Sequence, residues 1–350
     1  MINLYRKLKK RIVLQSPDTL FKDSNHNEIK ESEEPNFEIQ SFGENNSDKT
    51  FYVIKRTPGT GFFSNITFIL NHLLISEKLG YIPIIDMQNY KTIYNEKNKI
   101  KNTLNAWEYY FKKLNNFELT EVYKSKNVII TNNKFYNNFY YNFLENEKLK
   151  EFFVKKIEIK KNLIKIYEKI CSNFKNKKTL GIHFRGTSYK RTPGHPFPPT
   201  KDQIIVCVKK IIEKEKIEKI FLATEEQDYL DFFKKKFPNN LIYIRSSYRS
   251  NRNDAFKIYP RNRHRYKLGR EILLESMILS KCDIFLYSNS NVSKAVIGFN
   301  FNIKQKKYEM DNGFNTKNIF ISQFLWYLKK MLPQSFGGFK KDIINWKIKK

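Results

Sequence analysis

The chain has 350 residues, of which 40% are hydrophobic and 15% aromatic. This length corresponds to about two domains, and the apolar content is enough for packed cores, which excludes wholesale disorder. Lysine and arginine number 65 against 35 acidic residues, a formal net charge of +30. Such a charge favours an anionic partner: nucleic acid, an acidic membrane or a phosphate-bearing small molecule. Part of the excess reflects a composition rich in Lys, Asn and Ile, as in proteins from AT-rich genomes.

The cysteines and the apolar runs bear on the compartment. Cys171, Cys207 and Cys282 are far apart in apolar stretches, which predicts free buried thiols and neither a disulfide framework nor a zinc site. No apolar run approaches the roughly 20 residues of a membrane span. The basic N-terminus has too short an apolar part for a secretory signal. We expect a soluble, cytoplasmic protein, with peripheral contact at an anionic inner membrane as an option.

In the first half, one strand–helix–strand unit stands out after a polar, poorly periodic stretch. Alternating and buried apolar runs flank a glycine-containing turn and a helix that ends at Gly80, which predicts a parallel sheet. Aromatic and charged helices are expected further on. The expected elements are a loose lead-in over 1–50, a strand over 50–56, a turn over 57–61, a helix over 66–80 capped by Ser64 or Asn65, a strand over 81–87, and helices within 100–115 and 145–177.

The second half alternates strands and helices, which predicts a doubly wound α/β domain. Strands are expected at 179–186, 219–226, 240–247 and 283–290, and helices at 202–216, 228–237, 268–282 and from 291. A last amphipathic helix over 319–332 could pack on the first domain or lie on a lipid surface, and packing is favoured. The domain boundary is expected near 175, in a Lys- and Asn-rich segment.

In open parallel sheets, ligands bind at the carboxyl ends of the strands. Arg185, Gly186 and Thr187 lie at the carboxyl end of one predicted strand, and Glu225 and Glu226 lie at that of the next. The SNSNVS run, 288–293, lies at the end of a third strand and opens a helix. A forked guanidinium and a helix N-terminus both suit phosphate, so two such half-sites predict a pyrophosphate and a nucleotide-linked donor.

Each of these residues also has a purely structural explanation. Arg185 could pair with a structural carboxylate, and SNSNVS could be only a helix cap. His183 lies within a strand and could be a core histidine. The basic loop over 249–265 could bind RNA, although the regular α/β series argues against a simple RNA module.

Other chemistries find little support. The turn at 57–61 is neither a P-loop nor a full dinucleotide fingerprint, and neither GxSxG nor HExxH occurs. The nearest approach to a metal-binding DxD pair is Glu226-Gln227-Asp228, which we interpret as surface. A metal-free reaction is therefore favoured.

At these residues the sequence resembles a family of fucosyltransferases: the rhizobial nodulation enzymes, the animal core α1,6-fucosyltransferases and, more distantly, the protein O-fucosyltransferases. GIHFRGTSYKRTPGHPFPPT, from residue 181, resembles the family's H-x-R-x-T…H-P segment. The similar segments occur in the family's order between about 51 and 300. The others are TPGTGFFSN from 57, IIDMQNY from 84, NAWEYYF from 105, FLATEEQDYLDFFKKKFP from 221 and HRYKLGREILLESMILSKCDIFLYSNSNVSKAV from 264.

The resemblance implies a GT-B architecture, two Rossmann-like domains with a donor cleft between them, and inverting, metal-independent transfer from GDP-fucose without a cofactor. It assigns 51–175 to the acceptor side, 176–310 to the nucleotide sugar, and 311–350 to a C-terminal helix and basic tail. Arg185 is implied to contact the β-phosphate, His183 the nucleotide and Asp254 the guanine. The remaining donor-binding residues are implied to be Gly186, Thr187, His195, Ser290, Asn291 and Val292, with Gly59, Gly61 and Phe62 closing from the first domain.

The chain also departs from the family's pattern. Arg185 is followed by Gly-Thr-Ser where relatives often carry a second Arg and Thr-Asp, and no carboxylate lies between Thr187 and His195. The general base is therefore open among Asp86, Glu108, Glu225 and Glu226. Partners are expected to be the donor and a bacterial surface glycan acceptor, such as capsule or lipopolysaccharide, with a lipid-linked form as one option. The alternatives are a GDP-heptose or UDP-sugar donor, or a non-catalytic protein that binds RNA or acidic lipid. For the favoured glycosyltransferase, no nucleic acid partner is expected.

Overall fold

The computed structural model describes residues 37–59, 61–132, 147–252, 254–299 and 304–346. Its contacts divide the chain into two compact units. The first comprises the described residues of Met1–Tyr109 and Lys113–Glu145, and the second those of Tyr110–Lys112 and Asn146–Lys350. The predicted α/β class is confirmed in both units, and each is taken by itself below.

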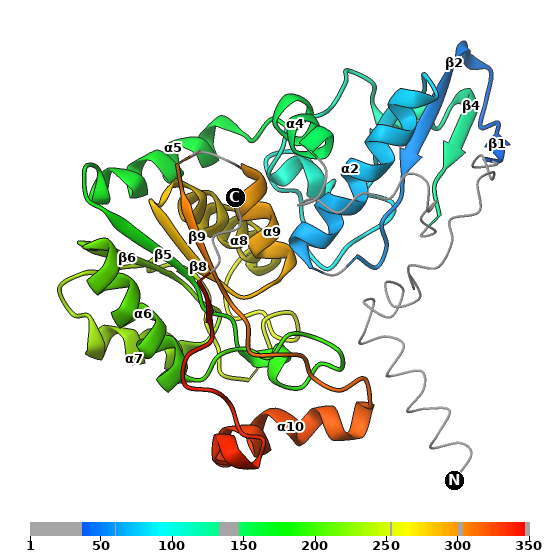
Figure 1. The fold of residues 1–350 in the computed structure, drawn as a ribbon. Helices are drawn as coiled ribbons and strands as arrows, with labels where there is room; N and C mark the ends of the chain where they lie inside the picture. Colours follow the sequence, from blue (N-terminus) through cyan, green and yellow to red (C-terminus); the bar gives the residue numbers. More distant parts are fainter. Residues whose placement is uncertain (1–36, 60, 133–146, 253, 300–303, 347–350) are drawn as a thin grey trace. The chain divides into compact units, whose positions relative to one another are not determined.

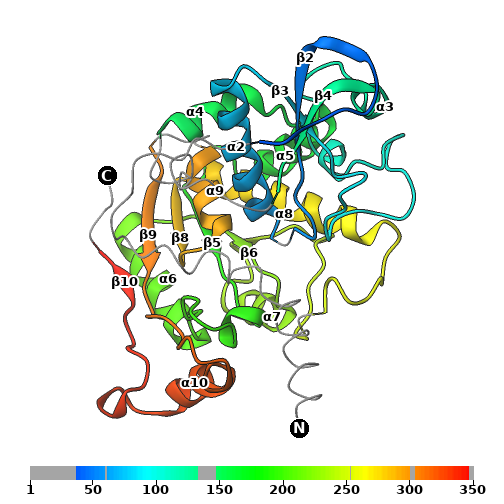
Figure 2. The same ribbon diagram turned by 90° about the vertical axis from the view of Figure 1, so that its right-hand side faces the viewer.

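The first unit is built on a four-stranded sheet in the order β1-β4-β2-β3 (Figures 1 and 2). The strands are β1 (Ile39–Gln40), β2 (Asn45–Ile54), β3 (Ile82–Ile85) and β4 (Ser125–Ile130). β2 pairs in parallel with β3 and β4, and β1 is antiparallel to β4. The predicted strand–helix–strand unit is therefore confirmed. Its first strand begins at Asn45, so the end of the expected lead-in belongs to the sheet.

Helix α2 (Phe62–Lys78) connects β2 to β3. The prediction that Ser64 or Asn65 caps it is wrong. The N-cap is Gly61, whose carbonyl accepts the first helical hydrogen bond from Asn65 N (3.0 Å), and both polar side chains are buried in the first turn. Short α3 (Leu119–Val122) precedes β4.

The helix expected within 100–115 is reduced to the 3-10 turn η2 (Ala106–Tyr109). The helix does not continue because Phe111 forms an antiparallel bridge with Ile159, and Lys112 N donates to Glu158 O (2.8 Å). Backbone groups used in a bridge are not free for helical pairing.

The second unit holds a six-stranded sheet in the order β10-β9-β8-β5-β6-β7, parallel except for β10. The strands are β5 (Thr179–His183), β6 (Lys219–Ala223), β7 (Leu241–Ile242), β8 (Ile284–Tyr287), β9 (Lys306–Met310) and β10 (Ile344–Asn345). The helices are α4 (Glu147–Lys156), α5 (Lys161–Cys171), α6 (Lys201–Glu215), α7 (Gln227–Lys236), α8 (His264–Lys281), α9 (Asn291–Phe299) and α10 (Ile319–Met331), with the 3-10 turns η4 (Ser172–Phe174), η5 (Thr187–Lys190) and η6 (Gln334–Phe336).

Helices cover both faces of this sheet, as the predicted alternation requires. Helices α6 and α7 pack apolar side chains on one face, and α8 packs on β5 and β6 from the other, with α5 and α9 beside it (Figures 1 and 2). Thr200 and Gln203 form a capping box that starts α6. Cys207 and Cys282 are buried free thiols, as expected, whereas the free thiol of Cys171 is only half-buried.

The two units separate near 145, about thirty residues before the expected boundary at 175. Helices α4 and α5 belong to the second unit because α5 packs on α8, and the Phe153 ring lies edge-on to that of Phe299 at 5.2 Å. Within the described residues, no helix is long and apolar enough to cross a membrane.

Candidate functional site

The strand order of the second unit defines where a ligand fits. From β5 the chain builds β6 and β7 on one side, and it then returns to place β8 and β9 on the other. The switch point therefore lies between β5 and β8, and such points are where parallel sheets bind ligands. His183 is in register with Ala223 and Tyr287, so the residues that follow β5, β6 and β8 meet at one edge.

Arg185 lies at this edge with its guanidinium held on one side. Its Nε is 3.5 Å from Glu225 Oε1, and its guanidinium carbon lies 4.1 Å from the centre of the Tyr189 ring. The Tyr189 ring in turn contacts that of His195, at 4.8 Å. About 30% of the Arg185 side chain stays exposed. A guanidinium positioned by a ring and a carboxylate, with an open side, is suited to bind an anion.

Gly186 is packed against the acidic pair. A Cβ at this position would lie 2.0 Å from Glu226 Oε1 and 2.8 Å from the Tyr229 ring. Glu226 is buried, and Lys190 Nζ lies 2.8 and 2.9 Å from its two oxygens. Only glycine fits while this ion pair is in place. The pairing favours a structural role for Glu226, and its part in catalysis stays a prediction.

The predicted residues after Gly186 lie in η5 and in the loop that follows. Thr187 begins η5, and its side chain lies outside the described residues. His195 is held through its backbone, whose carbonyl accepts a hydrogen bond from Asn315 N (2.8 Å). The loop is thereby joined to the chain ahead of α10.

The third part of the edge is the start of α9. Ser290 and Ser293 bond to each other reciprocally: Ser293 N donates to Ser290 Oγ (3.1 Å) and Ser290 N to Ser293 Oγ (2.9 Å). Ser290 is therefore a helix cap, as its structural explanation required. The N–H groups of Asn291 and Val292 are first-turn donors that a helix cannot satisfy itself. Ser288 Oγ, at the end of β8, is buried without a hydrogen-bond partner in the part of the chain that the structure describes.

His183 precedes Arg185 on β5 and is partly buried. Burial lowers the pKa of His183 to about 3, and the charge of Arg185 acts in the same direction. The ring is therefore neutral at pH 7. A neutral imidazole can bind an uncharged polar group without adding charge to the site.

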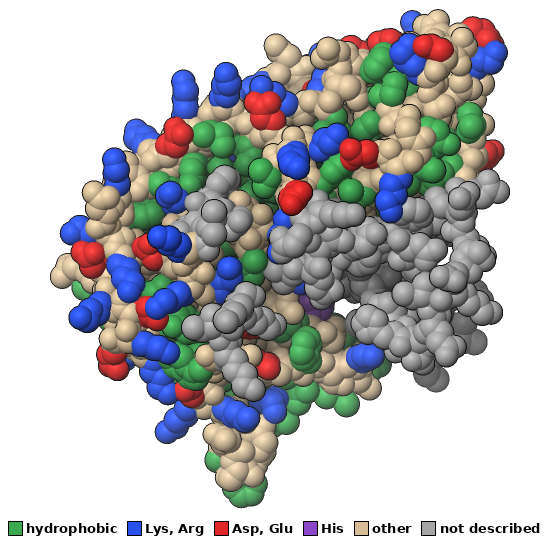
Figure 3. Space-filling model, turned by 45° about the horizontal axis from the view of Figure 1, so that its top comes forward, with side chains coloured by type: hydrophobic (Ala, Val, Ile, Leu, Met, Phe, Trp, Pro, Cys, Tyr) green, Lys and Arg blue, Asp and Glu red, His purple; other side chains and the backbone are tan. Residues whose placement is uncertain are grey.

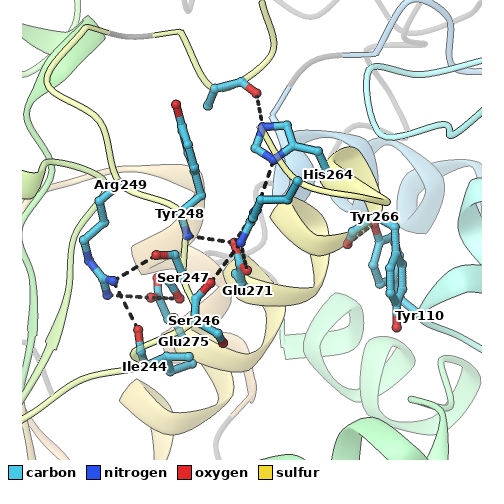
Figure 4. Close-up of polar contacts among 12 residues, drawn as sticks. Tyr110, Ile244, Ser246, Ser247, Tyr248, Arg249, His264, Tyr266, Glu271 and Glu275 are labelled. Carbon is cyan, nitrogen blue, oxygen red and sulfur yellow. Dashed lines mark hydrogen bonds and ion pairs between the residues drawn. The ribbon is translucent and has the colours of Figure 1, made fainter. Parts of the chain in front are cut away.

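The basic loop between β7 and α8 is held by acidic residues of α8 (Figure 4). Arg261 forms two contacts with Glu271, at 2.6 and 3.0 Å, and Arg249 NH2 lies 3.6 Å from Glu275 Oε1. Burial raises the pKa of Glu275 to about 7, although Arg249 acts against it. These two arginines face inward, which weakens the hypothesis that the loop binds RNA.

Asp254 belongs to the same loop. Its Oδ1 accepts a hydrogen bond from the Tyr248 hydroxyl (3.0 Å), and Ser250 N donates to Glu225 O (3.0 Å). Hydrogen bonding by Ser250 lowers the pKa of Asp254. The loop therefore presents a carboxylate on a segment joined to the end of β6.

Asp86 and Phe62, two of the site residues predicted in the first unit, are both buried. Asp86 is fully buried, and its oxygens accept four hydrogen bonds, from Gln88 N, Asn89 N, Asn89 Nδ2 and the Tyr123 hydroxyl. This saturation is typical of a structural turn carboxylate, so its catalytic part also stays a prediction. Phe62 is buried, with its ring edge-on to that of Tyr94, so the ring has little access to a nucleotide-sugar donor.

Gly59 and Gly61 lie in the turn before α2. Gly59 has φ +44°, in the left-handed region that favours glycine, and a Cβ there would lie 2.8 Å from Asn65 Oδ1. Gly61 has room for a side chain. That this turn closes over a donor stays a prediction.

The first unit also contains a cavity of about 490 Å³, lined by residues of that unit. Its lining includes Glu108, Asn105 and Trp107 of the η2 region. We place the candidate site at the edge of the second sheet, because that is where the cationic and helix-start groups converge.

Charge is widely distributed over the surface. Lysine and arginine side chains are scattered over the left of the face shown in Figure 3. Among the described residues, no group of three His, Cys, Asp or Glu side chains could hold a metal ion.

Several contributors were missed from the sequence. The roles of Lys190 and Glu225 follow from ion pairs between residues 36 and 40 positions apart, which no local pattern signals. The Tyr189 ring contacts Arg185, only four residues away, in the turn after β5. The position of Tyr189 and Lys190 within the segment that resembles the family was the one available signal.

Solved structures of fucosyltransferases are similar to this chain. NodZ alpha-1,6-fucosyltransferase co-crystallized with GDP has 13% identity and a TM-score of 0.49, over 75% of this chain and 95% of that chain. Fucosyltransferase NodZ from Bradyrhizobium has 12% identity and a TM-score of 0.48, with the same shares. POFUT1 in complex with GDP-fucose has 11% identity and a TM-score of 0.43, over 73% and 95%.

The chain matches no protein-family model, and no curated protein sequence is similar to it at a significant level. At these identities and TM-scores the likeness to the solved structures is distant. The activity has to be inferred from the residues of this chain.

Proposed function

We propose that this protein is a glycosyltransferase that binds a GDP-sugar, GDP-fucose first among the candidates, at the β5–β8 edge of the second unit. The observation that carries the proposal is the convergence of Arg185, Gly186 and the start of α9 at the switch point of a parallel sheet. The GT-B arrangement, with a first unit that closes over the donor and supplies the acceptor side, belongs to the proposal.

The proposed chemistry is inverting and needs no metal ion. An acceptor hydroxyl attacks C1 of the sugar, the bond from C1 to the diphosphate oxygen breaks, and GDP leaves with the bonding electrons. Arg185 and the N–H groups of Asn291 and Val292 would stabilise the negative charge that grows on the diphosphate. The neutral His183 would contact the nucleotide, and Asp254 would accept hydrogen bonds from guanine.

We propose Glu225 as the base that takes the proton of the acceptor. It is 41% exposed and adjoins Arg185, whereas Asp86 and Glu226 are buried and fully engaged. When a diphosphate binds Arg185, it competes with Glu225 and leaves that carboxylate freer to accept a proton. Glu225→Gln should lower kcat without weakening GDP binding, because it removes the carboxylate that competes with the diphosphate for Arg185.

The acceptor and its location are also proposed. A bacterial surface glycan, such as capsule or lipopolysaccharide, built at the cytoplasmic face of the inner membrane fits the composition of the chain and its +30 charge. A GDP-heptose or UDP-sugar would use the same phosphate groups, and the nucleotide comparison below separates them.

The test is calorimetry with GDP, UDP, CMP and ADP on the wild type, Arg185→Ala and the control Lys219→Ala. Lys219 begins β6 at the opposite edge of the sheet, so the control removes the same charge away from the site. We expect selective GDP binding, weakened about 10- to 100-fold in Arg185→Ala because a charge-assisted contact is worth about 1.5–3 kcal/mol. Absence of nucleotide binding by the folded wild type would refute the proposal. Preference for UDP would show that the donor is a UDP-sugar and not a GDP-sugar.

A further inference from the structure

Helix α10 has an apolar stripe that points away from the core of the second unit. Phe320, Phe324 and Met331 are 81%, 73% and 75% exposed, and Tyr327 is exposed as well. Their spacings of four, three and four residues place them on one face of the helix. These four residues are called the α10 stripe below. Large apolar groups gathered in this way on a surface mark an interaction site.

The opposite face already anchors the helix on the second unit. Trp326 is buried, and its Nε1 donates to Pro198 O (2.8 Å). Ser322 is buried too, and its carbonyl accepts a hydrogen bond from Asn315 Nδ2 (3.0 Å). Asn318 caps the helix start. The stripe is therefore not needed to hold α10 in place, and Figure 1 shows the helix at the margin of its unit.

The stripe is widened by neighbours in the same segment. Ile321 and Leu328 are about half exposed on one flank of the helix, and Phe336 of η6 is 75% exposed. Phe314, ahead of the helix, is 64% exposed. The described part of the chain thus gathers its most exposed aromatic side chains between residues 314 and 336.

The charge around the stripe has one sign. Residues 312–341 contain five lysines and no aspartate or glutamate: Lys317, Lys329, Lys330, Lys340 and Lys341. The Arg191 guanidinium adds a further cation, 5.5 Å from the Tyr327 ring. A second copy would bring the same positive charge to the contact, so self-association through this face is disfavoured.

An anionic bilayer would bind both the exposed apolar side chains and the positive charge around them. Its acyl region takes up Phe and Met side chains, and its headgroups attract the flanking lysines. Thirteen residues of helix are too few to span a bilayer, so the helix would lie in the plane of the interface.

We propose that the α10 stripe and its lysines dock the protein on an anionic lipid surface. This inference deepens the membrane contact of the proposed function by naming the surface that makes it. It rests on α10 alone and does not require that the donor assignment be right. Docking would concentrate the protein where a lipid-linked acceptor resides.

The test is flotation of the full chain with vesicles of phosphatidylcholine alone or mixed with phosphatidylglycerol. The test variant is Phe320→Ser/Phe324→Ser/Met331→Ser. The matched control, Val154→Ser/Ile258→Ser/Tyr259→Ser, removes exposed apolar side chains elsewhere in the same unit. A charge variant, Lys317→Gln/Lys330→Gln, removes two exposed lysines near the stripe.

We expect the wild type and the control to float with the anionic vesicles and less so at high salt. The stripe variant should lose on the order of a thousandfold in partitioning, because each of the three large apolar side chains removed costs roughly a tenfold factor. The charge variant should lose the preference for anionic lipid. Circular dichroism and GDP calorimetry on the stripe variant separate loss of docking from unfolding or loss of the donor site.

Equal flotation of the stripe variant and the wild type would overturn the proposal. Concentration-dependent dimerisation that the stripe substitutions abolish, without vesicle binding, would also overturn it and make a second copy the occupant. Failure of GDP binding with intact flotation would refute the donor site and leave the docking surface standing.

Discussion

Replacement of Gly186 by alanine tests the packing behind the candidate site. The new Cβ would lie 2.0 Å from Glu226 Oε1, 2.6 Å from its Cδ and 2.8 Å from the Tyr229 ring. Neither neighbour can withdraw easily. Lys190 holds both oxygens of Glu226, and the Tyr229 ring is stacked 3.8 Å from that of Phe184.

The expected cost follows from what must give way. If the carboxylate stays, overpacking costs about 1–3 kcal/mol. If it moves, the buried ion pair with Lys190 is broken, which costs about 3–5 kcal/mol. We therefore expect Gly186→Ala to lower the free energy of unfolding by about 2–3 kcal/mol and to weaken GDP binding, because Arg185 is the preceding residue.

A double-mutant cycle identifies the clash. Urea unfolding would be measured for Gly186→Ala, Glu226→Ala and the double variant, with Gly61→Ala as a glycine control that has room for a Cβ. In the Glu226→Ala background, Gly186→Ala should lower the free energy of unfolding by at least about 1 kcal/mol less than it does in the wild type. The Gly61→Ala control should lower the free energy of unfolding by less than about 1 kcal/mol. Additive losses, or a wild-type stability for Gly186→Ala, would refute the reasoning.

Three further outcomes are expected. Asp86→Ala should lower the free energy of unfolding in urea by about 3 kcal/mol, because four donors lose their acceptor, while GDP affinity stays unchanged; weakened GDP binding at full stability would instead favour a role in the reaction. Burial lowers the pKa of His72 to about 3, so below about pH 6.5 the unfolded chain binds a proton that the native state does not. Stability should therefore fall as the pH falls from 6.5 towards 3, and His72→Gln should flatten that slope in thermal melts; an unchanged slope would contradict the assignment. Thr200→Ala removes the cap of α6 and should lower the free energy of unfolding by about 1 kcal/mol, whereas the control Thr120→Ala, at an exposed threonine of α3, should lower it by less than about 0.5 kcal/mol; equal losses in the two variants would contradict the capping role.

Periodic, local features were predictable from the sequence. The α/β alternation, the parallel sheet of the first unit and the amphipathic α10 follow from apolar spacing within ten to fifteen residues. The position of Arg185 after β5 and of Ser290 before α9 could be predicted for the same reason. The cap of α2 could not, because Ser64, Asn65 and Gly61 all suit a helix start and packing selected the glycine.

The sequence by itself determined which groups carry charge and which strands end in polar residues. Only the tertiary structure decided which of those groups are already engaged. Glu226 is paired with Lys190 and Asp86 is saturated by a turn, whereas Arg185, which contacts Glu225 and Tyr189, is still about 30% exposed. The α10 stripe belongs to the same class of result: its apolar period is visible in the sequence, but the face that meets solvent is fixed by Trp326. The physical reason is that pairing depends on contacts between residues far apart in the chain, and local spacing carries no information about them.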